Sequence, residues 1–195
     1  LISLVSAELA DIKNGNVKFD ASSYRRITAM AAEAGMPGPH VVRAWHAEAV
    51  RDAVAPGVAL KEGPWPAAVK EGVAAVARAA VEATRDMPAW YFYGIDEPRG
   101  DNTYAVQDYQ AWHAGGARTY ATVIDAAFLE KAAESLTAPC FGGNFLVDEK
   151  TQAIRQRVLQ SGAEYWWYGT GCYVNPYPQE AMLSANRFGG GFLFW

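Results

Sequence analysis

The expected fold is decided by the stretch Trp90-Tyr91-Phe92-Tyr93-Gly94-Ile95-Asp96-Glu97-Pro98. It runs apolar and aromatic for six residues, presents two carboxylates, and then reaches a proline that cannot continue a strand ladder. The pattern predicts a buried strand over residues 90–95. Both acids are then expected at the carboxyl end of that strand.

Similar short segments occur on either side of this stretch, and most of them are followed by apolar residues at helical spacing. Strands are predicted at residues 2–7, 41–45, 119–124, 138–141, 165–168 and 191–195. Helices are predicted at residues 21–34, 67–84, 104–115, 127–136, 150–160 and 179–187. This alternation is typical of βα units around a parallel sheet.

Parallel strands joined by helices can form an open doubly wound sheet or a closed barrel, and periodicity does not distinguish the two. No glycine-rich phosphate-binding loop follows any predicted strand, which removes the usual signature of the open sheet. We therefore expect a (β/α)8 TIM-type barrel. Seven strands fall short of the eight that a barrel needs, so the barrel is expected to be incomplete, a single domain over residues 1–195 of a longer protein.

The charge balance and the length of the apolar stretches argue against two classes of partner. The chain has 17 basic and 21 acidic residues, net charge -4, and no basic run that would neutralise a phosphate backbone. No apolar stretch approaches the roughly 20 residues of a membrane-spanning helix, and the first residues lack the basic start of a signal peptide. Neither nucleic acid nor a membrane is expected as a partner. The localisation stays open: periplasmic or secreted with a signal upstream, cytoplasmic otherwise.

Cysteine and histidine spacing predicts no metal and no cofactor. Cys140 and Cys172 form no CxxC pair, and the chain has only three histidines, none in HxH or HxxxH spacing. Aromatic residues are abundant instead, with 7 Trp and 10 Tyr. Such rings either fill a core or stack on the apolar faces of a sugar.

The adjacent acids Asp96 and Glu97 are the candidate catalytic residues. Catalytic groups of barrel enzymes gather at the carboxyl ends of the strands, and aromatic neighbours favour a carboxyl group that can act as a general acid. The alternative is that Asp96 caps the following turn and Glu97 is simply solvated.

Three motifs in this order carry a resemblance to a known family: residues 93–98 (YGIDEP), 165–168 (YWWY) and 186–195 (NRFGGGFLFW). Together they resemble the catalytic domain of glycoside hydrolase family 123 and its uncharacterised bacterial relatives. The likeness covers residues 90–195 well and the first 90 residues only in outline.

The resemblance implies a retaining β-N-acetylgalactosaminidase-like enzyme in which the 2-acetamido group of the substrate is the nucleophile. Glu97 would protonate the leaving glycosidic oxygen, and Asp96 would orient the acetamide. Consecutive strand residues point to opposite sides, which suits that division of roles.

The residues themselves also favour substrate-assisted catalysis. An ordinary retaining glycosidase needs a second carboxylate about 5 Å from the first as its nucleophile. The late strand at 165–168 has its only acid, Glu164, at the wrong end, and the strand before it ends at Asn144 with no acid before Asp148. No nucleophile of the ordinary kind is therefore offered by these strands.

Several strand ends are expected to bind the substrate: Trp45, Tyr93, Asn144, Trp167 and Tyr168. Because strand side chains alternate, either Trp167 or the pair Trp166 and Tyr168 faces the site. Tyr168 is the residue expected to hydrogen-bond the attacking acetamide. The rival hypotheses are a glycosidase of the same architecture that acts on another sugar, and a non-catalytic carbohydrate-binding protein.

Overall fold

The structure is a computed structural model, and it describes residues 2–3, 7–44, 46–142, 149–164 and 166–168. Its centre is a six-stranded parallel sheet with the strand order β1-β4-β5-β6-β7-β8. The strands are β1 (Ile2–Ser3), β4 (His40–Arg43), β5 (Trp90–Tyr93), β6 (Thr119–Val123), β7 (Ala138–Gly142) and β8 (Trp166–Tyr168). The strands run in chain order and in one direction, so all their carboxyl ends lie along one edge of the sheet.

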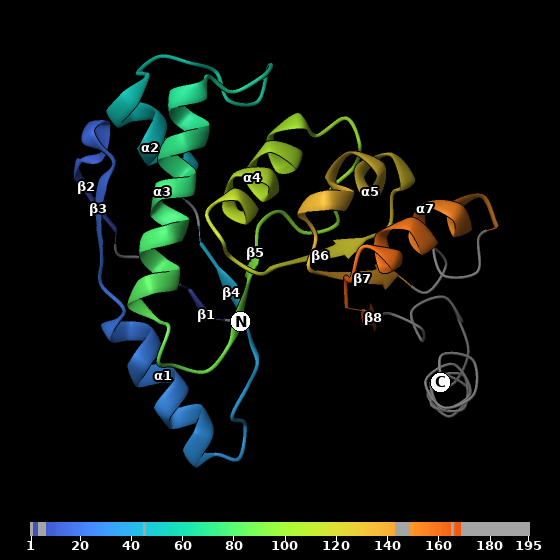
Figure 1. The fold of residues 1–195 in the computed structure, drawn as a ribbon, viewed down its shortest axis with the longest axis horizontal. Coiled ribbons are helices and arrows are strands. Elements are labelled where there is room, and N and C mark those ends of the chain that lie inside the picture. The colour runs from blue at the N-terminus through green and yellow to red at the C-terminus, as the bar shows by residue number, and fades with distance from the viewer. Residues whose placement is uncertain (1, 4–6, 45, 143–148, 165, 169–195) are drawn as a thin grey trace, which may run out of the picture.

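Helices connect the strands and form a layer along one side of them, as Figure 1 shows. They are α1 (Ser22–Glu33), α2 (Ala47–Val54), α3 (Ala67–Ala83), α4 (Thr103–Ala114), α5 (Ala126–Ala132) with the 3-10 turn η2 (Ala133–Ser135), and α7 (Glu149–Gln160). Right-handed crossovers between successive parallel strands place their helices on the same face of the sheet. None of the described helices is both long and apolar enough to cross a membrane.

The predicted TIM-type barrel is wrong. A closed barrel needs eight strands with its first and last strands paired, whereas the described part of the chain has six parallel strands. Among the described strands, β1 pairs only with β4 and β8 only with β7, so β1 and β8 do not pair with each other to close a barrel. The predicted strands that correspond to β4, β5, β6, β7 and β8 are found, but the alternation of strand and helix carries no information on whether the sheet closes.

The amino-terminal segment also departs from the prediction. The expected strand at residues 2–7 is the short β1, and Ala7 instead begins an antiparallel hairpin of β2 (Ala7–Asp11) and β3 (Asn16–Phe19) joined by η1 (Ile12–Asn14). This hairpin packs on α3, outside the parallel sheet. The predicted helix at 179–187 and strand at 191–195 lie outside the described residues.

The side chains of strand β5 point alternately to the two faces of the sheet, so the strand contributes to the packing on both faces. Trp90 and Phe92 face the helices, where Phe92 stacks on Trp112 of α4 with ring centroids 4.4 Å apart. Tyr91 and Tyr93 face the other side and meet aromatic rings of the later strands. The face of the sheet that is turned away from the helices is therefore rich in tyrosine and tryptophan.

Candidate functional site

The segment that follows β5 is held firmly in place. The backbone N–H of Gly94 donates to the hydroxyl of Tyr109 at 3.1 Å, and the N–H of Gly100 donates to Asp125 at 2.9 Å. Asp125 also caps α5 by accepting from the N–H of Phe128. A Cβ at Gly100 would lie 2.4 Å from that of Ala127, so the close approach requires glycine. The acids between Gly94 and Gly100 thus sit on a preorganised loop.

Asp96 is exposed, and hydroxyl groups of two neighbouring strands fix its orientation. Thr122 of β6 donates to Asp96 Oδ1 at 2.9 Å, and the hydroxyl of Tyr93 donates to the same oxygen. Burial, and secondly this hydrogen bond, raise the pKa of Tyr93 to about 12, so the phenol stays a donor at physiological pH. No described residue donates to Oδ2, so that oxygen can accept from a ligand.

Glu97 has a different partner and an unusual backbone. Its φ of 43° is the one left-handed value found among the described non-glycine residues. Such a conformation persists only when its surroundings enforce it, and it clusters at functional sites. Here the Glu97 N–H donates to Thr122 Oγ1 at 2.8 Å, and Tyr168 of β8 donates its hydroxyl to Glu97 Oε1.

Thr122 therefore connects the two acids. Its single hydroxyl donates to the Asp96 carboxylate and accepts from the Glu97 backbone. The two carboxylates have different further partners, because Tyr93 donates to Asp96 and Tyr168, on the far strand β8, donates to Glu97. Two acids with separate, fixed orientations can serve separate steps of one reaction.

A pocket of about 840 Å³ opens beside Asp96, on the side of α2 and α4. This volume is within the range of sites that bind small molecules. Its lining includes side chains of both charges among apolar surface: Arg43, Glu48, Lys61, Gly94, Ile95, Asp96, Asp101, Asn102, Tyr104 and Asp108. Glu97 is not among the residues that line this pocket.

The predicted site residues fall into three groups. Asp96, Glu97, Tyr93 and Tyr168 come together at the carboxyl ends of the strands. Trp45 and Asn144 lie outside the described residues. Trp167 is placed on β8, but its side chain is not among those described, whereas Trp166 packs on Tyr120. The hydroxyl of Tyr168 contacts Glu97 rather than Asp96.

Sequence reasoning missed three residues of this region: Glu48, Asp108 and Thr122. Thr122 lies inside a predicted strand, where alternation alone could have placed it on the same face as Tyr120. Glu48 belongs to α2, a helix that was not predicted although Ala47, Val50 and Val54 recur at helical spacing. Asp108 lies in the middle of a predicted helix, and nothing local marks it as buried.

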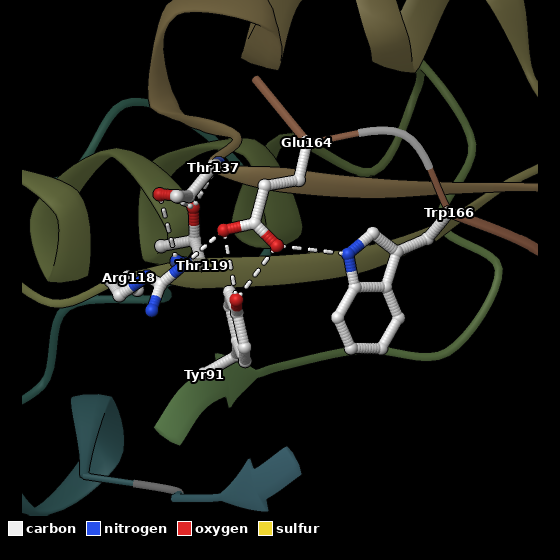
Figure 2. Close-up of polar contacts among 6 residues, drawn as sticks. All are labelled: Tyr91, Arg118, Thr119, Thr137, Glu164 and Trp166. Carbon is white, nitrogen blue, oxygen red and sulfur yellow. Dashed lines mark hydrogen bonds and ion pairs between the residues drawn. The ribbon is translucent and has the colours of Figure 1, made fainter. Parts of the chain in front are cut away.

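A second polar cluster lies at the opposite, amino-terminal ends of the strands (Figure 2). Glu164, just before β8, forms an ion pair with Arg118 and accepts from the Tyr91 hydroxyl at 2.8 and 2.9 Å. Trp166 Nε1 donates to Oε2 of Glu164 at 3.0 Å. All four groups belong to, or adjoin, strands β5, β6 and β8, so the cluster ties the starts of these strands together.

The described residues contain no group of three or more histidine, cysteine, aspartate or glutamate side chains that could hold a metal ion. A comparison with family models, curated protein sequences and solved structures finds no match to this chain. The resemblance in the three motifs therefore stays a prediction, and the functional argument depends on the geometry of the acids.

Proposed function

We propose that this protein is a retaining glycoside hydrolase that cleaves 2-acetamido-2-deoxy-β-glycosides with the help of the substrate's own acetamido group. One observation carries the proposal: two adjacent carboxylates are held apart by different hydroxyl groups, Asp96 by Tyr93 and Thr122, and Glu97 by Tyr168. A general acid and a group that orients the nucleophile need this kind of separation.

In the proposed reaction, Glu97 donates its proton to the glycosidic oxygen as the C1–O bond breaks. The acetamide carbonyl oxygen attacks C1 from the other face and closes an oxazolinium ring. Asp96 accepts a hydrogen bond from the acetamide N–H through Oδ2 and stabilises the positive charge that develops there. Glu97, now a carboxylate, takes a proton from the water that opens the ring, and the anomeric configuration is retained.

Tyr93 and Thr122 act as positioning residues in this scheme, because they touch Asp96 rather than the substrate. Their hydroxyls hold one oxygen of the carboxylate while the other is offered to the acetamide. An arrangement that is fixed before the substrate arrives costs little reorganisation during the reaction.

The test compares aryl 2-acetamido-2-deoxy-β-glycosides with the same aryl glycosides carrying a 2-hydroxyl. We expect hydrolysis of the first series alone, and inhibition by a thiazoline that mimics the cyclic intermediate. A 2-fluoro sugar separates this mechanism from covalent catalysis. Mass spectrometry that finds a stable sugar adduct on the peptide containing Asp96 would overturn the substrate-assisted mechanism, and equal rates on both series would do the same.

A further inference from the structure

The pocket beside Asp96 contains a buried acid that the proposed mechanism does not use. Asp108 of α4 lines the pocket and is 4% exposed. One turn along α4, the indole Nε1 of Trp112 is buried and has no hydrogen-bond partner among the described residues. A buried donor without a partner is costly, so it calls for an explanation.

Glu48 of α2 faces the same pocket and is held in a defined orientation. The hydroxyl of Tyr104, the first buried tyrosine of α4, donates to Glu48 Oε2 at 3.0 Å. Burial raises the pKa of Tyr104, with further contributions from Asp108 and Glu48, so the phenol remains a donor. One oxygen of Glu48 is thereby occupied, and Oε1 is left to accept from a ligand.

We propose that this pocket binds the sugar on the glycone side of the scissile bond, with Asp108 and Glu48 recognising its hydroxyl groups. The inference deepens the proposed function and rests on it. Asp96, which would hold the acetamide of that sugar, lines the pocket, whereas Glu97, which would face the leaving group, is not among its lining residues. The glycone therefore belongs on the α2 and α4 side, and the leaving group belongs toward Tyr168.

The chemistry of the lining fits a neutral, hydroxyl-rich ligand. Burial, and secondly the charge of Glu48, raise the pKa of Asp108 well above its ordinary value, which favours the neutral carboxyl, a group that can donate a hydrogen bond to a sugar hydroxyl. Glu48 is the matching acceptor for the next hydroxyl. Lys61 and Arg43 offset part of the acidic lining, which also includes Asp96 and Asp101. The excess of acidic groups disfavours an anionic ligand.

The proposal is tested by binding of two monosaccharides, 2-acetamido-2-deoxy-D-galactose and 2-acetamido-2-deoxy-D-glucose, measured by calorimetry on the full chain. Neither sugar is consumed, so the measurement is independent of catalysis. Asp108→Leu should weaken the binding of the preferred sugar by roughly 10- to 100-fold, the equivalent of one buried hydrogen bond. Asp108→Asn keeps a donor of the same shape and should stay within about threefold of the wild type.

Glu48→Ala provides a second test that does not depend on the core, because Glu48 is exposed. It should weaken binding by roughly 10-fold. Because the substitution also removes the acceptor of the Tyr104 hydroxyl, circular dichroism should confirm that the variant is folded. Glu33→Ala, at an exposed position of α1, is the matched control and should change nothing.

The two proposals fail in different ways. Unchanged binding in both Asp108→Leu and Glu48→Ala would overturn the assignment of the pocket, even if the protein hydrolyses N-acetylated glycosides. No binding of either sugar by the wild type would overturn it as well. Sugar binding that both substitutions weaken, in a protein without hydrolase activity, would support the pocket and refute the proposed reaction.

Discussion

The two ends of the parallel sheet use the same kinds of side chain for different purposes. At the amino ends, Glu164 is paired with Arg118 and both of its oxygens accept hydrogen bonds. At the carboxyl ends, Asp96 and Glu97 are held by hydroxyl groups, and no described lysine or arginine forms an ion pair with either. A carboxylate paired with a cation stabilises a fold, whereas a carboxyl group without such a partner and with an open oxygen can act on a ligand.

Backbone conformation shows the same difference. The loop after β5 places Glu97 in the left-handed region, which costs of order 1 kcal/mol for a residue of this kind. Glu164 has no positive φ, and its backbone N–H completes a hydrogen bond of 2.7 Å to Thr137. The backbone of Glu97 is strained at the carboxyl ends of the strands, whereas the backbone N–H of Glu164 is hydrogen-bonded at the amino ends. This difference supports the assignment of function to the carboxyl ends.

The largest expected effect is on catalysis by Glu97→Gln. Loss of the general acid should slow the cleavage of natural glycosides by roughly 10²- to 10⁴-fold. Activated aryl glycosides should be spared, because a good leaving group departs without protonation. Steady-state kinetics on both substrate types checks the prediction. Glu164→Gln, at the other end of the sheet, is the control and should change both rates by no more than a fewfold factor. If Glu97→Gln slowed both substrates equally, Glu97 would be excluded as the general acid.

Asp96→Asn is expected to have the next largest effect. The amide cannot stabilise the charge that develops on the acetamide, so kcat on N-acetylated substrates should fall by roughly 10²- to 10³-fold. The sugar should still bind, because the pocket is otherwise intact. Calorimetry with the monosaccharide, set beside the kinetics, separates the two quantities. A loss of affinity as large as the loss of kcat would mean that Asp96 acts in ground-state binding rather than in the chemical step.

The sequence predicted most of what lies along the strands, and it failed where the answer depends on distant parts of the chain. The aromatic run of β5 and the acids that follow Gly94 could be read directly, because the apolar pattern and the proline are local signals. The open sheet could not be predicted, since closure depends on whether β1 and β8 pair. Asp108 could not be recognised either, because its burial is produced by the packing of α4 on the sheet.

Two threonines of β6, one near each end of the sheet, provide a matched pair of substitutions that tests the different roles of the two ends. Thr122→Val preserves shape but removes both the donor to Asp96 and the acceptor for the Glu97 N–H. We expect kcat to fall by roughly 10-fold, as for one hydrogen bond to a charged group. Thr119→Val, at the start of β6, removes a hydroxyl that donates to the carbonyl of Ser135. It should lower the melting temperature and leave kcat unchanged; the opposite pattern would contradict the division of roles.

A smaller effect is expected on stability from Glu164→Gln. The substitution removes the ion pair with Arg118 and weakens the hydrogen bonds from Tyr91 and Trp166. Because the side chain is 36% exposed, solvent screening limits the loss in the free energy of unfolding to about 1–2 kcal/mol. Urea denaturation measures it. Glu130→Gln, whose ion pair with Arg157 is exposed and 4.0 Å long, is the matched control and should change the free energy by less than about 0.5 kcal/mol.

The smallest expected effect is the pH dependence that belongs to the same carboxylate. Burial alone would raise the pKa of Glu164, but hydrogen bonds from Tyr91 and Trp166, together with Arg118, hold it below the ordinary value of 4.5. A pKa that is lower in the folded state than in the unfolded state gives stability that is complete above pH 4.5 and is lost as the pH falls through the folded value. Between neutral pH and the acid range, the free energy of unfolding should therefore fall further in the wild type than in Glu164→Gln. The difference should be under about 1 kcal/mol, because the carboxylate is partly exposed. Urea denaturation of both proteins at pH steps below 6 measures this difference. Curves that fall in parallel would show that Glu164 has the same pKa in the folded and unfolded states, and would remove the electrostatic basis for calling the amino-terminal cluster structural.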